Sequence, residues 1–421
     1  MISPFFEKDQ ITIYQGDLLR VLPELPEASV DCVCTDPPYS LSFMGKDWDK
    51  EIPGPEYWRT IARVCKPGSM MLAFGGPRTF HRLTCAIEDA GWEIRDCLMW
   101  LYGQGFPKSM DISKAIDKAA GAEREVVGKY QPPGMNKPWN LQNAKDERTV
   151  DVFASSRNNL DITAPATDAA KQWQGWGTAL KPAWEPIILA MKPLCGTFAA
   201  NAEKYGVAGL NIDTCRIPSS TGSPAAERRA SARKNGTVPL QSRALGVDTV
   251  AEANQLGRFG YRGSAETYMA ERPSERLGRW PANLLLDEET AIELDVQSGL
   301  LKSGTNCVRS KPGTGYHGNI GKAGDLQTTY GDCGGASRFF YCAKTTQKER
   351  GAGNNHPCVK PIELMKYLLT LLSTPAGGVI LDPFAGSGST ALAAGQLGRR
   401  CICVELDGHY CDIAAARLQN S

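Results

Sequence analysis

The sequence has almost no net charge and no long apolar run. Its 421 residues carry a formal charge of +1 at pH 7, so any surface for a polyanion must be a local basic face. No apolar run is long enough to span a membrane, and residues 1–10 lack the basic-then-apolar pattern of a signal peptide. We therefore expect a cytoplasmic protein that does not contact membranes. Its length favours one large globular domain with inserted material.

Closely spaced metal ligands are also missing. The 14 cysteines are scattered, and none forms a Cys-x-x-Cys pair. Two pairs, Cys32 with Cys34 and Cys401 with Cys403, lie two residues apart within apolar runs, a spacing that places both side chains on one face of a strand. These features argue against a zinc site and favour reduced, buried thiols, so we expect no bound metal.

Strand and helix signals alternate at both ends of the chain. Short apolar runs end at Gly, Asp or Pro, and segments with apolar residues at helical spacing follow them. This alternation predicts an α/β fold with a parallel sheet covered on both faces by helices. The expected strands are residues 10–14, 30–34, 70–74, 93–101, 378–381 and 400–404, and the expected helices are residues 57–65, 80–90, 362–372, 389–397 and 409–418.

The middle of the chain differs in composition from both ends. Residues 103–180 contain Gly, Pro, Asn and Trp in irregular order, and residues 184–190 return to one strand-like run of the core. Residues 216–280 are rich in Ala, Gly, Ser and Arg, so they form either a basic binding segment or an ordinary solvated loop. Four tryptophans either stack on bases or fill a core, and we expect the core: Trp173, Trp176, Trp184 and Trp280. The chain is accordingly divided into residues 1–102, an inserted region of residues 103–330, and residues 331–421.

A glycine-rich loop is the best candidate for a cofactor site. The sequence Leu381-Asp-Pro-Phe-Ala-Gly-Ser-Gly-Ser-Thr390 joins a strand to a helix, and Gly386 and Gly388 let the backbone turn tightly and approach a ligand. The helix N-terminus offers free N–H groups suited to a carboxylate. Glu405 ends the next strand, about 20 residues on, where an acid binds ribose hydroxyls. A three-glycine dinucleotide fingerprint and a Gly-Lys-Ser/Thr phosphate loop are absent, which argues against NAD and ATP.

A tetrapeptide at the end of the expected strand 30–34, Asp36-Pro37-Pro38-Tyr39, is the candidate reactive site. An exocyclic amine of a nucleobase is a poor nucleophile, because its lone pair is delocalised into the ring. Acceptors for both amine hydrogens would localise that pair, and we assign the Asp36 carboxylate and the Pro37 carbonyl to this role. Tyr39 would stack on a base extruded from the helix. The alternative, a merely rigid turn, is less favoured beside the cofactor loop.

In their order, these motifs resemble those of the β-class DNA amino-methyltransferases, in which the catalytic motif precedes the cofactor motif. Asp36-Pro-Pro-Tyr39 resembles the catalytic motif, and Phe384-Ala-Gly-Ser-Gly388 resembles the S-adenosylmethionine motif. Two further segments, His356-Pro-Cys-Val-Lys360-Pro361 and Gly16-Asp17, also resemble family segments. The resemblance implies a circularly permuted, doubly wound, Rossmann-like methyltransferase sheet to which both ends of the chain contribute.

The resemblance covers residues 10–101 and 355–418 and implies S-adenosylmethionine as the cofactor. It also implies which residues bind that cofactor. Asp17 would face its adenine, Glu405 its ribose, Gly386, Gly388, Ser389 and Thr390 its methionine moiety, and His356 and Lys360 its carboxylate, with Asp382 and Phe384 in the same loop.

The resemblance further implies a site-specific enzyme that flips adenine out of double-stranded DNA and methylates N6, with residues 216–280 as the target-recognition segment. Asp rather than Ser at position 36 favours adenine, and cytosine-N4 is the alternative. An RNA methyltransferase or a non-catalytic DNA-binding module stays open as a further alternative. Carbon-5 cytosine methylation is rejected, because the only Pro-Cys pair, Pro357-Cys358, lies inside another family segment. The source would be a bacterium or bacteriophage, and a homodimer and a companion restriction endonuclease are both left open.

Overall fold

The computed structural model divides the chain into two units. Unit 1 comprises Met1–Gly103 and Trp184–Ser421, and unit 2 comprises Gln104–Ala183. Within the described ranges, every helix is too short or too polar to cross a membrane. The residues that the structure describes are 2–40, 51–103, 109–129, 161–217, 278–302, 307–308, 313–315, 318–321, 326–327, 333–343 and 359–420.

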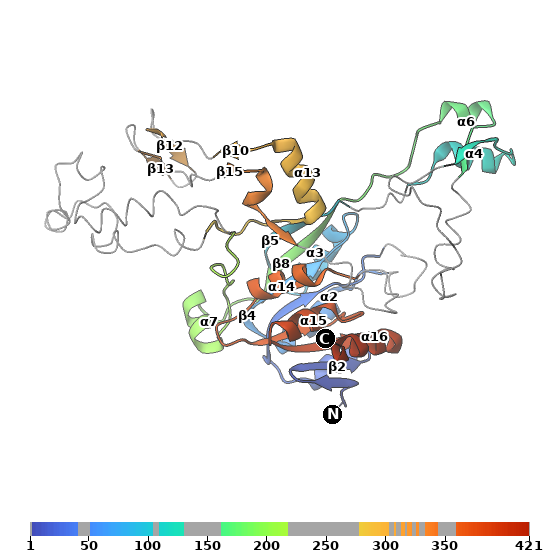
Figure 1. Ribbon diagram of the computed structural model, residues 1–421. Helices are drawn as coiled ribbons and strands as arrows, with labels where there is room; N and C mark the ends of the chain where they lie inside the picture. The colour runs from blue at the N-terminus through green and yellow to red at the C-terminus, as the bar shows by residue number, and fades with distance from the viewer. Residues whose placement is uncertain are drawn as a thin grey trace. The chain divides into compact units, whose positions relative to one another are not determined.

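Unit 1 contains a large sheet with helices packed on it (Figure 1). The strands of this sheet are β1 (Phe6–Lys8), β2 (Ile11–Gln15), β3 (Val30–Thr35), β4 (Cys65–Phe74), β5 (Glu93–Leu101), β8 (Trp184–Met191), β9 (Leu284–Asp287), β16 (Tyr341–Ala343), β17 (Val379–Asp382) and β18 (Arg400–Glu405). The helices are α1 (Leu18–Val21), η1 (Leu22–Glu24), α2 (Pro55–Val64), α3 (Phe80–Asp89), α7 (Phe198–Tyr205), α13 (Glu288–Ser298), η5 (Ala336–Phe339), α14 (Ile362–Leu371), α15 (Ser389–Gln396) and α16 (Gly408–Gln419). Three two-stranded ladders are formed by β10 (Leu301–Lys302) with β15 (Cys333–Gly334), β11 (Cys307–Val308) with β14 (Leu326–Gln327), and β12 (Gly313–Gly315) with β13 (Gly318–Gly321).

The order and direction of the strands show a doubly wound sheet. The strands lie in the order β1-β2-β18-β17-β3-β4-β8-β5-β9-β16. The run from β2 to β4 is parallel throughout, whereas β8 is antiparallel to both of its neighbours, β4 and β5. β17 and β18 come from the C-terminal part of the chain and lie between β2 and β3 from the N-terminal part. The predicted α/β fold and its circular permutation are therefore confirmed.

Helices cover both faces of this sheet and bury two hydrophobic clusters. On one face α14, α15 and α16 contribute residues such as Leu368 and Ala391. On the other face α1, α2 and α3 contribute residues such as Trp58 and Ile87. Burying each large apolar side chain stabilises the fold by ~1.5–3 kcal/mol relative to exposure. Because both faces of the central strands are covered, every residue of β3 is buried, as parallel sheets require.

Most of the predicted elements at the two ends of the chain are present within a few residues of their predicted bounds. The main difference lies at Lys66-Pro67-Gly68, which we expected to end a helix. Instead α2 ends at Val64 and β4 begins at Cys65, so these residues belong to the strand. The Lys66 ammonium pairs with Asp31 at 2.6 Å, which ties the start of β4 to β3 and explains the early strand.

The middle of the chain contributes more to the sheet than its composition suggested. The expected strand at 184–190 is β8, and β9 and β16 extend the sheet beyond β5. β9 is an apolar run too short for periodicity to distinguish a strand from a helix. The expectation that tryptophans fill a core is wrong for three of them. Trp173, Trp176 and Trp280 are exposed by 42%, 61% and 64%. Residues 218–277 of the expected target-recognition segment lie outside the described residues.

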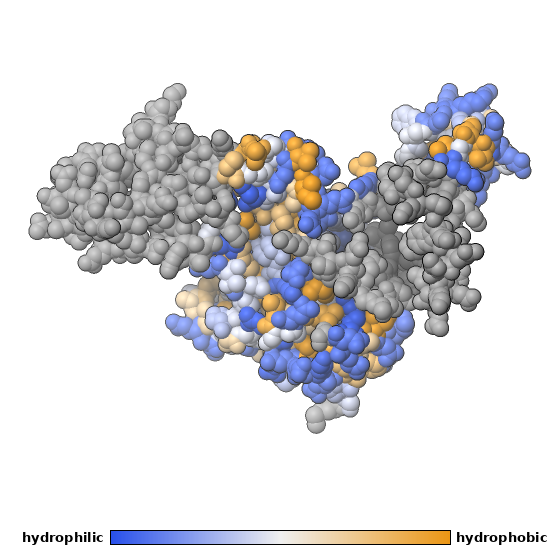
Figure 2. Space-filling model, viewed as in Figure 1, coloured by the Kyte–Doolittle hydropathy of each residue, from blue (hydrophilic) through white to orange (hydrophobic). Residues whose placement is uncertain are grey.

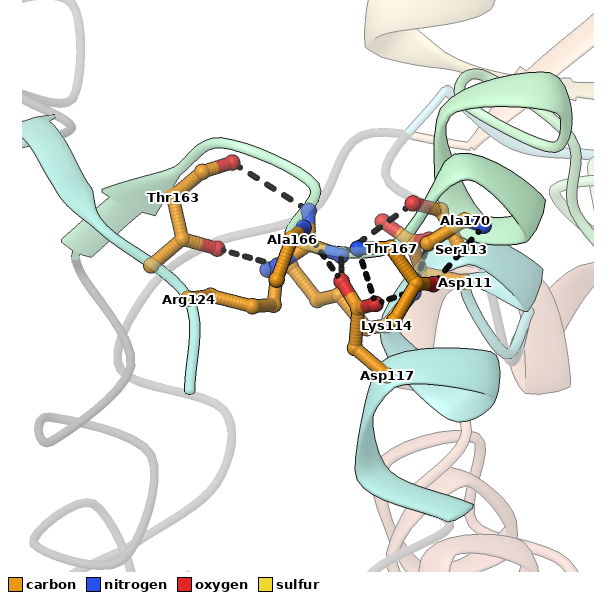
Figure 3. Close-up of polar contacts among 9 residues, drawn as sticks. All are labelled: Asp111, Ser113, Lys114, Asp117, Arg124, Thr163, Ala166, Thr167 and Ala170. Carbon is orange, nitrogen blue, oxygen red and sulfur yellow. Dashed lines mark hydrogen bonds and ion pairs between the residues drawn. The ribbon is translucent and has the colours of Figure 1, made fainter. Parts of the chain in front are cut away.

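Unit 2 is organised around a buried carboxylate, Asp117 of α4 (Ile112–Ala119). Asp117 accepts hydrogen bonds from the N–H groups of Ala166 and Thr167, both at 3.0 Å, and from the Thr167 hydroxyl at 2.8 Å. Its ion pair with Arg124 measures 2.6 Å (Figure 3). Burial favours the protonated form, but these hydrogen bonds outweigh it and lower the pKa of Asp117 to about 2. The network joins α4 to the segment that enters α6 (Asp168–Gln172).

Apolar packing contributes little to the described part of unit 2. Ala170 is the only hydrophobic residue buried there. The antiparallel pair of β6 (Val126–Lys129) and β7 (Asp161–Thr163) and the described residues after α6 expose apolar side chains. Figure 2 shows hydrophobic patches among hydrophilic residues on this part of the surface. The polar network of Asp117 is therefore the main interaction that orders this unit.

We expect Asp117→Ala to loosen unit 2 and leave unit 1 folded. Without the carboxylate, two N–H groups and a guanidinium lose their acceptor, so the exchange protection of the Ala166 and Thr167 amides should fall by ~10-fold or more. A lowered pKa stabilises the folded state only while Asp117 is ionised, so wild-type protection should be lost as the pH falls from about 4 toward 2. Hydrogen exchange read by mass spectrometry measures both effects.

The matched control is Asp168→Asn, because the Asp168 side chain is 97% exposed and its ion pair with Lys171 lies on the surface. This variant should exchange like the wild type. Unchanged protection factors in Asp117→Ala would show that the network does not order the unit.

Candidate active site

The candidate site lies at one edge of the unit 1 sheet, where its parallel strands end. β17 pairs with β3, with Ile380 opposite Cys32, so the loop after Asp382 and the tetrapeptide after Thr35 leave neighbouring strands. β8 runs in the opposite direction, so its first residues reach this same edge. Ligands of open α/β sheets bind at such an edge, beside the point where the strand order reverses.

The glycine-rich loop after β17 is held against α16. Gly388 has a φ of 78°, and a Cβ at this position would lie 2.8 Å from the Cβ of Ala414, so only glycine fits without strain. From the same helix, Arg417 Nη1 donates to the Ser387 carbonyl at 2.5 Å and lies 3.4 Å from the Ser389 hydroxyl. Because the N-cap of α15 is a glycine, no side chain there accepts from the first N–H groups of the helix. These groups face the end of a fixed loop, an arrangement suited to an anion.

Glu405 ends β18 beside this loop. Its carboxylate accepts hydrogen bonds from the N–H groups of Gly386 at 2.7 Å and of Asp407 at 2.9 Å. Burial raises the pKa of Glu405, and the two backbone hydrogen bonds oppose that rise. Asp17 follows the adjacent strand β2 and is the N-cap of α1, and the N–H of Gly16 donates to the Glu405 carbonyl at 2.9 Å. Two acidic residues therefore lie at the ends of the two strands on one side of the glycine-rich loop.

Asp382 is the buried link between the two loops. Its Oδ1 accepts hydrogen bonds from the Thr35 hydroxyl at 2.7 Å and from the Phe384 N–H at 3.2 Å, and the residue is 2% exposed. Burial raises the pKa of Asp382 to about 6, and the charge of nearby Asp36 adds to the rise, while hydrogen bonds from Thr390, Thr35 and Phe384 oppose it. Because Thr35 directly precedes Asp36, this bond couples the glycine-rich loop to the tetrapeptide.

Asp36 is held by two donors that also reach a second carboxylate, Glu185 at the start of β8. Lys360 Nζ lies 2.7 Å from Asp36 Oδ2 and 3.2 Å from Glu185 Oε2. The Tyr39 hydroxyl lies 2.5 Å from Asp36 Oδ1 and 3.3 Å from the same Glu185 oxygen. The Lys360 side chain is only 7% exposed, so its ammonium is buried between two carboxylates. We call these four residues the carboxylate–lysine cluster.

The structure brings together most of the residues that the sequence predicted for the site. Pro37 and Pro38 lie between Asp36 and Tyr39, two members of the carboxylate–lysine cluster. Ser389 and Thr390 form the buried first turn of α15. Lys360 was expected at the cofactor carboxylate, and the structure places its ammonium on Asp36. His356 lies outside the described residues. Among the residues that are described, no group of three or more His, Cys, Asp or Glu side chains could hold a metal ion.

Two residues of the site were not predicted. Glu185 is the acidic residue at the start of the apolar run 184–190, but its position at this edge depends on the direction of β8, which the pattern does not reveal. Arg417 lies in the last turn of α16, where a basic residue is usually explained by the helix dipole. In both cases the sequence showed only a charged residue at the end of a strand or helix, where such residues are common for structural reasons.

We expect the free energy of unfolding to fall with rising pH because of Asp382. A pKa that is raised in the folded state stabilises that state below pH 4, and the contribution is lost as the pH rises through about 6. A shift from 3.8 to about 6 corresponds to ~3 kcal/mol at most. Asp382→Asn keeps an acceptor and carries no charge, so relative to the wild type this variant should gain stability as the pH rises from about 4 to about 6, the window between the unfolded and the folded pKa.

Urea unfolding at several pH values measures this difference. Asp412→Asn, at an exposed position of α16, is the control for removing a carboxylate charge at the surface. A wild-type minus Asp382→Asn difference that does not vary with pH would contradict the assignment.

Comparison with known proteins agrees with this geometry. A family model described as DNA methylase (N6_N4_Mtase) matches residues 30–416. The type II methyltransferase M2.DpnII of Streptococcus pneumoniae is 44% identical over 75 residues, which cover 18% of this chain and 27% of that protein. The type II methyltransferase M.ScaI of Streptomyces caespitosus is 42% identical over 77 residues, which cover 18% of this chain and 24% of that protein. The aligned segments therefore span only about a quarter of the length of these relatives.

The solved structures that match this chain include M1.HpyAVI in complex with SAM and the cytosine-N4-specific PvuII DNA methyltransferase. The first covers 97% of this chain and 99% of its own at 14% identity and a TM-score of 0.37. The second covers 99% and 89% at 13% identity and a TM-score of 0.40. The family match is the stronger finding, because it runs from β3 to α16 and includes both loops of the site. The chain belongs to the DNA methylase family.

Proposed function

We propose that this protein transfers a methyl group from S-adenosylmethionine to the exocyclic N6 amine of adenine in double-stranded DNA. One observation carries the proposal. The glycine-rich loop with Glu405 and the tetrapeptide with Asp36 lie at the ends of adjacent strands and are joined by the 2.7 Å bond from Thr35 to Asp382. A nucleotide-like cofactor and an acceptor for amine hydrogens are thereby held side by side, as direct transfer between two substrates requires.

The cofactor is S-adenosylmethionine, which supplies an electrophilic methyl group bonded to a sulfonium. Its adenosine would lie between Asp17 and Glu405, whose carboxylates are acceptors for amine and hydroxyl hydrogens. The narrow turn at Gly388 and the first N–H groups of α15 would hold the methionine end. The close packing of Gly388 on Ala414 of α16 fixes the turn that presents these N–H groups.

The target amine would donate its hydrogens to the Asp36 carboxylate and the Pro37 carbonyl. These bonds localise the nitrogen lone pair, which then forms the new N–C bond while the electron pair of the S–C bond returns to sulfur. The surplus proton on nitrogen leaves by way of Asp36. Tyr39 would stack on the extruded base. The carboxylate also stabilises the positive charge that develops on the amine, a form of catalysis worth ~100-fold or more.

Adenine is preferred to cytosine because of the acceptor at position 36. Both bases present an amine conjugated to a ring, so the mechanism applies to either. A carboxylate is a stronger acceptor than the hydroxyl of serine, and the resemblance associates aspartate at this position with adenine enzymes. Cytosine-N4 is the second candidate, and the family that matches the chain includes both activities in its name.

DNA contacts are proposed for the segment 216–280. Its described ends already combine basic and aromatic side chains, because the Arg216 guanidinium lies 5.1 Å from the centroid of the exposed Trp280 ring. The Arg216 side chain is only 6% exposed and pairs with Asp213 at 2.9 Å, so the exposed Trp280 ring is the group that would contact a base.

We expect Glu405→Ala to weaken S-adenosylmethionine binding in the absence of DNA. The loss of a charged acceptor for ribose hydroxyls should cost ~1.5–3 kcal/mol, or about tenfold or more in Kd. Calorimetry measures the Kd directly, and Glu405→Gln, which keeps an acceptor, should lose less. Asp412→Ala, on the exposed face of α16, is the control. Unchanged affinity in Glu405→Ala would remove this residue from the cofactor site.

The test of the proposed function is the identity of the methylated nucleoside. The enzyme is incubated with mixed-sequence double-stranded DNA and labelled S-adenosylmethionine, and the DNA is digested to nucleosides for mass spectrometry. We expect label in N6-methyladenine, and we expect Asp36→Ala to reduce it ~100-fold or more. Label in N4-methylcytosine alone would replace the adenine assignment. Label in 5-methylcytosine, or in RNA but not DNA, would overturn the function.

A further inference from the structure

Glu185 has no part in the transfer as proposed, yet it lies within reach of both donors that hold Asp36. We propose that Glu185 is a positioning residue that receives the Lys360 ammonium and the Tyr39 hydroxyl when the target amine binds Asp36. The inference rests on the proposed function, because it requires an amine to compete for the Asp36 carboxylate.

The starting point is that both oxygens of Asp36 already have side-chain donors. Tyr39 donates to Oδ1 at 2.5 Å and Lys360 donates to Oδ2 at 2.7 Å. Each oxygen has lone pairs left for another donor. A carboxylate whose charge is compensated by an ammonium is nevertheless a weak acceptor for an amine. Activation of the target therefore requires these two donors to loosen their hold on Asp36.

Glu185 offers both donors a second acceptor at one oxygen. Its Oε2 lies 3.2 Å from Lys360 Nζ and 3.3 Å from the Tyr39 hydroxyl. Charge-assisted bonds are usually 2.7–2.9 Å long, so a movement of about half an ångström changes the preferred partner. Since Lys360 is 7% exposed, its ammonium is screened little by solvent, and a second carboxylate at 3.2 Å compensates its charge as it leaves Asp36.

The charges of the carboxylate–lysine cluster favour the same conclusion. Two carboxylates and one ammonium leave a net charge of −1 beside the amine, which becomes positive as it is methylated. Without the charge of Glu185 the cluster is neutral and Lys360 stays on Asp36. Loss of Glu185 should therefore slow methyl transfer itself, with little effect on the binding of cofactor or DNA.

Among the described residues near Glu185, the phenol of Tyr102 is not an anion. Glu185 lies opposite Trp100 of β5 in the antiparallel pairing. Burial raises the pKa of Tyr102 to about 12, with the charge of Glu185 adding to the rise and Lys360 opposing it, so this phenol stays neutral. β8 lies between β4 and β5 and runs antiparallel to both. Its first residues, including Glu185, therefore reach the edge at which β4 and β5 end.

The test compares Glu185→Gln with the wild type in single-turnover methyl transfer to DNA, with separate measurement of the Kd for S-adenosylmethionine and for DNA. The amide keeps the shape and removes the charge. We expect the rate to fall ~10-fold or more, with both Kd values within about twofold of wild type. Glu185→Asp, which restores the charge, should recover part of the rate. Glu363→Gln, whose ion pair with Lys366 lies at the start of α14, is the control and should transfer at the wild-type rate.

A second comparison separates repositioning of Lys360 from general damage. In a Lys360→Met background no ammonium needs a second acceptor, so the further change Glu185→Gln should alter the rate by less than about threefold. The proposal is overturned if Glu185→Gln transfers at the wild-type rate, or if its effect is equally large in both backgrounds. If Glu185→Gln fails to bind the cofactor, the rate of methyl transfer in Glu185→Asp decides. A rate as low as that of Glu185→Gln overturns the proposal, and a partly recovered rate supports it. A wild type that methylates no DNA amine would instead show that the proposed function is wrong.

Discussion

The pairing of β17 with β3 is the contact on which the site depends. It joins strands from the two ends of the chain, and the bond from Thr35 to Asp382 at their ends links residues 347 positions apart. A parallel pair leaves both following loops at the same edge, so the segment that would bind a cofactor and the segment that would bind a base cannot separate without breaking the centre of the sheet. Burial of these strands on both faces makes that break costly.

The alternation of strands and helices at the two ends of the chain was predictable because local patterns determine it. Buried parallel strands read as short apolar runs, and the covering helices show apolar residues at helical spacing. The same reasoning failed where an apolar run was short, or where the surface against which an apolar side chain would pack was unknown. β9 has only four residues, and Trp173, Trp176 and Trp280 lie in segments that bury few side chains, so their large apolar rings stay exposed.

More residues of the candidate cofactor site than of the site around Asp36 could be predicted from the sequence. Glycines between a strand and a helix, and an acid at the end of the next strand, are separated by short, regular distances along the chain. Lys360 and Glu185 of the carboxylate–lysine cluster come instead from two distant segments, and Glu185 reaches the cluster only because β8 is antiparallel. The direction of β8 depends on how the chain connects it to β5. The local sequence patterns in residues 104–183 do not reveal that connection.

The carboxylates at this edge differ in what compensates their charge, and the difference decides which one can change partners. Glu405 is held by two backbone N–H groups, which belong to a fixed loop and cannot leave it. Asp382 is held by two hydroxyls and a backbone N–H in a site so buried that its pKa rises to about 6. Asp36 is held by the ends of two side chains, Lys360 and Tyr39, whose donors rotate about single bonds. Of the three, Asp36 can therefore exchange its donors for a substrate amine while the backbone around it stays in place.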